Sequence, residues 1–219
     1  MTRRIQQLAG TGLLVLLTFG LLPQPVKAQV TPSALEQKEG LMYQIGASEP
    51  FTGQVAVEGQ MKGQYKAGLR VGHWLGMYPS GKTQWTSDYN DAGQMLAHTM
   101  YHSNGQKRFE GNFSEGQPTG VHTAWDETGD IASETPYQNG ARHGTHKIWA
   151  NGALSYSAEF VNGDRDGATI WWYADGNKKW ATYYQKGKRW GIWTQWHKNG
   201  RILAQSEWKD GALKERHSP

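Results

Sequence analysis

A glycine recurs along the chain at nearly constant spacing, and this repeat limits the possible folds more than any other feature of the sequence. Successive intervals between these glycines are 24, 24, 23, 24 and 24 residues. The glycines are Gly81, Gly105, Gly129, Gly152, Gly176 and Gly200. An aromatic residue follows each of them by eight positions, at Tyr89, Phe113, Tyr137, Phe160, Tyr184 and Trp208. A fixed period of this size is typical of repeat proteins, in which neighbouring units share one continuous core.

Most units contain a second glycine at a regular position. It stands three residues after the aromatic in the last five, at Gly116, Gly140, Gly163, Gly187 and Gly211, and four residues after it at Gly93. In five places a further glycine follows by four, in the pairs Gly68 and Gly72, Gly116 and Gly120, Gly140 and Gly144, Gly163 and Gly167, and Gly187 and Gly191. The repeats therefore extend from Tyr65 to about Leu213.

The stretch after each repeat glycine alternates with period two, which is the pattern of a β-strand. In the first unit Trp85, Ser87 and Tyr89 share one face, and the residues between them are polar. The equivalent residues are Phe109, Gly111 and Phe113, then Tyr156, Ala158 and Phe160, then Trp180, Thr182 and Tyr184. One face should therefore be packed and the other wet, as in an antiparallel meander.

The turn at each repeat glycine can be typed. Four residues earlier the chain is always apolar or aromatic, at Met77, Tyr101, Trp125, Ile148, Trp172 and Trp196. A three-residue loop with a left-handed glycine would put this position on the packed face, and Pro79 suits such a type I turn. We therefore predict an all-β fold, an elongated antiparallel meander of six hairpin repeats with about twelve strands, two for each hairpin.

The unit that begins at Gly187, GKRWGIWTQWHKNGRILAQSEWKDG, resembles the MORN repeat variant. The resemblance covers residues 65–213, although the second repeat departs from it, with Ala92-Gly93 and Leu96 in place of the glycine pair. The segment 41–55, LMYQIGASEPFTGQV, is similar to the opening unit of bacterial YwqK-type antitoxins. The resemblance implies an elongated sheet of β-hairpins and a binding function rather than catalysis.

Residues 1–28 are expected to be a signal peptide. Arg3 and Arg4 precede an apolar stretch over residues 8–22, and Val26-Lys27-Ala28 suits cleavage after Ala28. An uncleaved anchor is the alternative. We expect a periplasmic or secreted protein with no transmembrane span after cleavage, divided into a linker (29–40), a degenerate N-terminal cap hairpin (41–64), the repeats (65–213) and a tail (214–219).

Composition and short motifs exclude several kinds of functional site. The chain has no cysteine, which excludes thiolate nucleophiles and Cys-ligated zinc. Without residues 1–28 it carries 20 basic and 19 acidic residues, so no nucleic acid partner is expected. Residues 76–83, GMYPSGKT, match the P-loop expression, but an alternating strand follows them where that motif needs a helix. His122, His143 and His146 lack the arrangement of a metal site. We predict no catalytic residues, cofactor or metal.

The candidate partner-binding residues are the aromatics that this turn would leave on the open face. They are Trp74, Tyr78, Trp149, Trp171, Tyr173 and Trp193. Exposed tryptophan and tyrosine rings give large, rigid contact area to protein partners or sugar rings. Alternatively, they form a second small core. The predicted function is a non-enzymatic protein-interaction scaffold, with an envelope polysaccharide binding module as the alternative and a hydrolase that uses the sheet as a groove as a third possibility.

Overall fold

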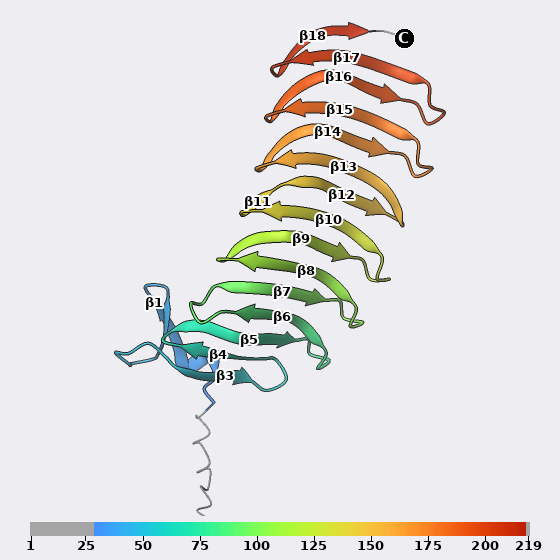
Figure 1. Cartoon of the computed structure of the whole chain (residues 1–219). Helices are drawn as coiled ribbons and strands as arrows, with labels where there is room; N and C mark the ends of the chain where they lie inside the picture. The colour runs from blue at the N-terminus through green and yellow to red at the C-terminus, as the bar shows by residue number, and fades with distance from the viewer. Residues whose placement is uncertain (1–28, 218–219) are drawn as a thin grey trace, which may run out of the picture.

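The structure, a computed structural model, describes residues 29–217, so the predicted signal peptide lies outside the described residues. Almost all of this chain forms one antiparallel sheet of sixteen strands in which consecutive strands are neighbours (Figure 1). The predicted all-β meander is confirmed. No helix among residues 29–217 is long and apolar enough to cross a membrane.

The strand bounds follow the repeat closely. Six hairpins make up the predicted repeats: β5 (Leu69–Met77) with β6 (Thr83–Tyr89), β7 (Met95–Tyr101) with β8 (Lys107–Ser114), β9 (Gln117–Trp125) with β10 (Ile131–Gln138), β12 (Gly144–Ala150) with β13 (Ala153–Val161), β14 (Asp164–Trp172) with β15 (Lys178–Gln185), and β16 (Lys188–Trp196) with β17 (Ile202–Lys209). The remaining strands of the sheet are β3 (Gly53–Val57), β4 (Met61–Lys66), the short β11 (Ala141–Arg142) and β18 (Ala212–His217). These four raise the number of strands above the twelve expected from the hairpins alone.

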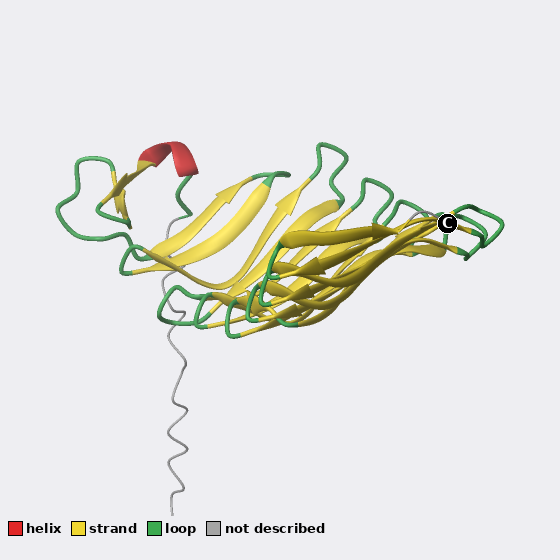
Figure 2. Ribbon diagram, turned by 90° about the horizontal axis from the view of Figure 1, so that it is seen from above, coloured by secondary structure: helices red, strands yellow, loops and turns green. Residues whose placement is uncertain are grey.

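A small two-stranded sheet stands over the N-terminal end of the large one (Figure 2). It follows a short 3-10 helix, η1 (Pro32–Ala34), and consists of β1 (Leu35–Lys38) and β2 (Leu41–Gln44). Of the segment 41–64, expected to be one cap hairpin, β2 joins this small sheet and β3 and β4 join the large one. A hydrophobic core cluster lies beneath the small sheet and consists of Val55, Tyr65 and Trp74. Six further residues pack against it: Leu35, Met42, Phe51, Met61, Trp85 and Tyr89.

The three-residue turn is confirmed at five of the six repeat glycines. At Gly81, for example, the Gly81 N–H donates to the Tyr78 carbonyl at 2.9 Å and the Tyr78 N–H donates to the Lys82 carbonyl at 2.8 Å. The prediction is wrong at Gly152, where Ala150 pairs with Ala153 across a two-residue turn. Asn151 and Gly152 both have positive φ, 53° and 75°, as a type I′ turn requires. One residue fewer in this turn accounts for the single 23-residue interval.

Two-residue turns with both central residues at positive φ close the opposite edge of the sheet. They lie at residues 67–68, 115–116, 139–140, 162–163, 186–187 and 210–211. Gly93 is the exception on this edge, because Asn90 and Gln94 enclose a three-residue loop there. Gly93 therefore stands one residue later than its equivalents because its turn is one residue longer.

A β-bulge beside every repeat turn changes which side chains share a face. In the first repeat Met77 pairs with Thr83 and Gly76 pairs with Trp85, so Gln84 is an extra residue in β6. The same shift occurs at the other five repeat turns. Because one extra residue reverses the side on which all later positions point, counting from the turn alone assigns β5 to the wrong face.

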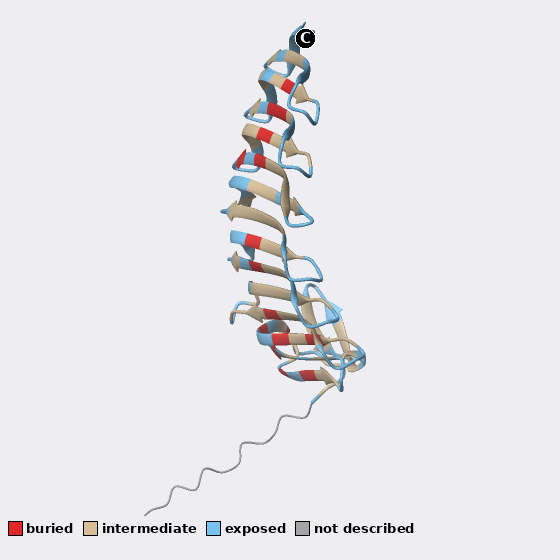
Figure 3. Ribbon diagram, turned by 90° about the vertical axis from the view of Figure 1, so that its right-hand side faces the viewer, coloured by how far each residue is buried: buried red, intermediate tan, exposed pale blue. Residues whose placement is uncertain are grey.

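We call the face that carries Trp85, Tyr89, Phe109, Phe113, Tyr156, Phe160, Trp180 and Tyr184 the aromatic face. The small residues between these rings, including Ser87, Ala158 and Thr182, are buried, as predicted for the packed face. Most strands bury no more than two residues, and together these residues form a thin line that crosses the strands instead of a full layer (Figure 3). Within the described residues only the segment around β1 and β2 lies over this face, at its N-terminal end.

Candidate functional site

Three of the six candidate residues lie on the aromatic face and not on the open one. Trp74 pairs with Ser87, and Trp171 pairs with both Tyr156 and Trp180. The ring of Trp193 lies 5.5 Å from that of Tyr184. The predicted open-face position of Trp74, Trp171 and Trp193 is therefore wrong. The physical reason is the bulge in the strand after each repeat turn, at Gln84 in the first repeat, because the prediction allowed only for the bulge formed by the turn glycine itself.

Two further candidates, Tyr78 and Tyr173, lie at the turn edge of the sheet. The Tyr78 hydroxyl donates to the Tyr101 carbonyl at 2.6 Å, and the Tyr173 hydroxyl donates to the Trp196 carbonyl at 2.9 Å. In each case the acceptor belongs to the following repeat. Both rings therefore join successive repeats, and their hydroxyl groups are already engaged within the chain.

Trp149 is the candidate that lies on the face opposite the aromatic one. It is two residues from Lys147 along β12, and the Lys147 ammonium lies 6.0 Å from the centre of its ring. His146 and Ile148 alternate with these two residues, and His146 lies against Tyr156 on the aromatic face. The six candidates therefore do not form one row.

The structure instead brings rings together at the C-terminal end of the aromatic face, around an open hollow of about 380 Å³. We call this the aromatic hollow, and its lining residues are Trp171, Lys179, Trp180, Thr182, Tyr184 and Trp193. Trp171 lies 5.2 Å from Tyr156 and Trp193 lies 5.1 Å from Trp208, measured between ring centres. The hollow thus continues the row of rings that runs along the sheet.

Arginine side chains flank this row, and they were not among the predicted site residues. The guanidinium carbon of Arg189 lies 5.0 Å from the ring of Trp193 and 4.5 Å from that of Trp208. Arg165 donates to the hydroxyls of Tyr184 and Tyr156, both at 3.3 Å. Cation–π contacts and these hydrogen bonds hold the rings in fixed orientations. The spacing in the sequence could have identified these arginines. Each stands two residues after a glycine of the second series, at Arg70, Arg142, Arg165 and Arg189.

Three histidines occupy the middle of the aromatic face in successive repeats. His98 shares a hydrogen bond of 2.8 Å with Ser87, and His146 shares one of 2.9 Å with Thr135. The ring of His122 lies 4.6 Å from that of Tyr137. Burial lowers the pKa of His98 and His146, although hydrogen bonds to the backbone of Thr86 and Glu134 oppose the shift. Each ring has its own partners, so these histidines are packing elements of the sheet.

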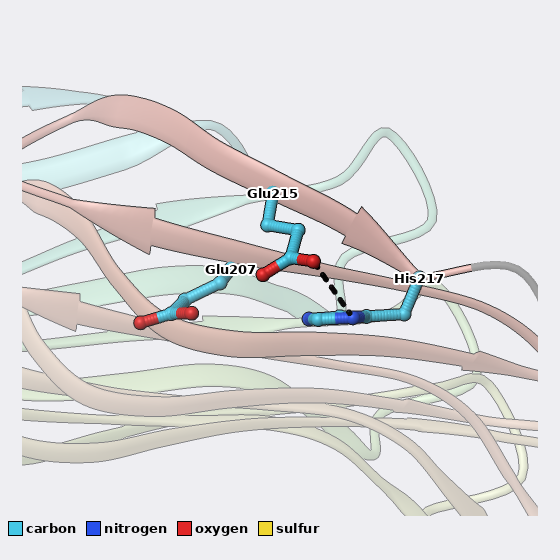
Figure 4. Close-up of side chains that lie close together, drawn as sticks. All are labelled: Glu207, Glu215 and His217. Carbon is cyan, nitrogen blue, oxygen red and sulfur yellow. Dashed lines mark ion pairs between the residues drawn. The ribbon is translucent and has the colours of Figure 1, made fainter.

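A possible metal-ligating group lies on the last two strands and was not foreseen. Glu207, Glu215 and His217 place their ligand atoms within 4.8 Å of one another (Figure 4). All three residues are exposed, and Glu207 pairs directly with Glu215 across the strands. His122, His143 and His146 are not part of any such group among the described residues.

The segment 76–83 that matches the P-loop expression forms a strand, a turn and a strand. Gly76 belongs to β5, residues 79–81 form the three-residue turn, and Thr83 begins β6. A P-loop cradles phosphate with successive N–H groups that lead into a helix. In this turn the N–H groups of Tyr78 and Gly81 are already bound to backbone carbonyls.

Comparison with known proteins agrees with the repeat over a short segment. A family model described as the MORN repeat variant matches residues 118–139, which lie in β9 and β10 and the turns that adjoin them. No curated protein matches the chain. The chain thus has a MORN-type repeat in an extended β-meander.

Proposed function

We propose that this protein is a non-catalytic interaction scaffold that binds an extended protein partner along its aromatic face. One observation carries the proposal: aromatic and histidine rings in successive repeats line one face of the sheet. The sheet itself is a single layer thick (Figure 2). From Trp85 to Tyr137 the successive ring centres are 4.6 to 6.5 Å apart. Repeat proteins bind extended partners through one set of contacts per repeat.

The setting of the protein is also part of the proposal. The leader at residues 1–28, with Arg3, Arg4 and a short apolar stretch, supports export to the periplasm or beyond. An antitoxin-like role, as the resemblance to YwqK-type proteins implies, is one form that such a scaffold takes.

The test is capture of the partner from an envelope extract of the host by immobilised residues 29–219. We expect one protein to be retained in stoichiometric amount by the wild type and by the Trp149→Ala variant, whose ring is on the other face. The double variant Trp171→Ala with Trp193→Ala should lose it. Loss of the retained protein's activity on binding would identify an antitoxin-like role. Retention of no protein would contradict the proposal.

A second candidate function is binding of an envelope polysaccharide, and the aromatic hollow favours it. Trp171, Trp180 and Trp193 present three indole rings within one depression, and such rings stack well on sugar rings. This function predicts retention of the protein on purified polysaccharide, with loss in the Trp171→Ala and Trp193→Ala double variant. Bound glycan without bound protein would favour this candidate over the scaffold.

A further inference from the structure

The two ends of the aromatic face carry equivalent groups of side chains five repeats apart. Trp74 stands seven residues before the turn glycine Gly81, and Trp193 stands seven residues before Gly200. The matched pairs are Trp74 with Trp193, Tyr65 with Tyr184, Arg70 with Arg189, and Tyr89 with Trp208. The two groups are therefore the same site built twice by the repeat.

Their geometry agrees closely. Trp74 lies 5.0 Å from Tyr65, and Trp193 lies 5.5 Å from Tyr184, between ring centres. The guanidinium carbon of Arg70 lies 4.9 Å from the Trp74 ring, and the corresponding distance at the other end, from Arg189 to Trp193, is 5.0 Å.

The two ends differ in what lies over them. Trp74 is 1% exposed and belongs to a core cluster with Val55 and Tyr65. The segment around β1 and β2 packs Leu35, Met42 and Phe51 against this cluster. Trp193 is only partly buried and borders the aromatic hollow. The covered end shows which kind of chain segment this group of side chains accepts: one with bulky apolar residues in a β-hairpin.

A glycine explains why the open end forms a hollow. The Trp74 ring lies against Gly63, where an added Cβ would be 2.1 Å from the ring. The repeat places Thr182 at the position equivalent to Gly63. Because Thr182 has a side chain, the Trp193 ring cannot lie against the strand in the same way. It stands beside Thr182 as one wall of the hollow.

Charge distinguishes the open end further. Residues 164–217 contain eleven lysines and arginines and six acidic residues, whereas residues 29–163 contain nine and thirteen. The segment that covers Trp74, residues 35–51, contains Glu36, Glu39 and Glu49 and only one basic residue, Lys38. A segment of this composition complements the basic C-terminal third of the sheet.

We propose that the aromatic hollow is the docking site for an acidic segment of a partner protein that carries bulky apolar side chains. Its chemistry is that of residues 35–51, which cover the equivalent group at the other end. The hollow lies on the same face that this segment covers at the other end, so docking there would repeat a contact that the chain makes internally. This inference rests on the proposed scaffold function and specifies the chemistry of the partner.

The test uses a labelled synthetic peptide of residues 35–51 with the mature chain, residues 29–219, and measures fluorescence anisotropy. We expect saturable binding that weakens as salt is added. Trp193→Ala should weaken binding at least about tenfold, as removal of a central aromatic contact does. Trp149→Ala is the matched control and should leave it unchanged. A peptide with Met42 and Phe51 changed to Ser should also bind at least about tenfold more weakly.

If circular dichroism shows that Trp193→Ala does not fold, a change of charge in the hollow supplies a second variant. Lys179→Glu changes a lining residue at the strand bulge, and we expect it to weaken peptide binding and to reduce the dependence on salt. A peptide with Glu36, Glu39 and Glu49 changed to Gln should show the same loss on the wild-type chain.

Several results would overturn the inference. One is that the labelled peptide does not bind the wild-type chain. Another is that folded Trp193→Ala or Lys179→Glu binds the peptide as tightly as the wild type does. A third is that polysaccharide displaces the peptide while excess unlabelled peptide does not. Self-association of the chain that depends on Trp193 would also overturn it, because the occupant would then be a second copy. Capture of an envelope protein that survives Trp193→Ala would leave the scaffold function intact and reject only this site.

Discussion

At the scale of single residues, the sheet compensates for the lack of an opposing layer by packing large rings on small neighbours. Trp74 lies against Gly63, and an added Cβ on Gly111 would be 2.9 Å from the ring of His122. Thr169 is fully buried between strands although it is polar. Side chains on neighbouring strands thus replace the contacts that a second layer would supply.

Trp74→Ala should be strongly destabilising, because Trp74 is the largest fully buried side chain among the described residues. We expect a loss of about 3 to 5 kcal/mol in the free energy of unfolding of the N-terminal end, measured by urea titration. Trp149→Ala, on the uncovered opposite face, should lose less than about 1.5 kcal/mol. Equal losses for the two variants would show that the cap does not bury Trp74 in solution.

Two histidines on the aromatic face, His98 and His146, should make the stability of the fold depend on pH. Burial lowers the pKa of His98 and His146 in the folded chain, whereas the unfolded chain has the ordinary value of about 6.5. The unfolded chain therefore binds more protons as pH falls. The stability that these neutral rings contribute is present above about pH 6.5 and is lost as pH falls through their folded pKa.

Unfolding by urea at pH 7.5 and pH 5 measures this dependence. Changing both His98 and His146 to Gln should reduce the loss of stability between the two pH values. His197→Gln, at an exposed turn position, should leave it unchanged. A pH dependence that is the same with and without His98 and His146 would contradict the expectation.

At the scale of strands and turns, the sequence predicts the fold well and the assignment of faces poorly. The period, the glycine positions and the alternation after each turn are local patterns, and they led directly to the hairpins. The bulges at Gln84 and Lys179 depend on how two strands pair, which no local pattern in one strand records. One unrecorded residue is enough to reverse a face, so Trp74, Trp171 and Trp193 were predicted on the wrong side.

The short turn at Gly152 gives a test of turn chemistry. Gly152 has φ of 75°, and a side chain there strains the left-handed backbone. Gly152→Ala should therefore lose about 1 to 2 kcal/mol of stability. Asn151→Gly, which keeps a residue that tolerates positive φ, should change stability by less than about 0.5 kcal/mol. A tolerated Gly152→Ala would mean that the turn in solution is not type I′.

At the scale of the whole molecule, the chain is a linear array of strands, and the two ends of this array are protected in different ways. Within the described residues each strand of the large sheet contacts mainly its neighbours along the sheet. At one end Val30 pairs with Val55 and the small sheet covers the face. At the other end β18 is exposed at every residue, with Lys214, Glu215, Arg216 and His217 in succession. Charged residues on an edge strand oppose pairing with other chains.

A one-dimensional array should respond locally to a local change. Trp208 contacts Trp193 and Arg189 and donates from Nε1 to Ser206 at 2.9 Å, so all these contacts lie within β16 and β17. Trp208→Ala should accelerate amide hydrogen exchange in β16 to β18 and leave β4 to β6 unchanged, because each repeat depends on its neighbours alone. Trp74→Ala should give the mirror image, with faster exchange confined to the N-terminal end. Acceleration along the whole sheet in either variant would mean that the sheet unfolds as a single cooperative unit, and the aromatic hollow could then not bind a partner independently of the covered N-terminal end.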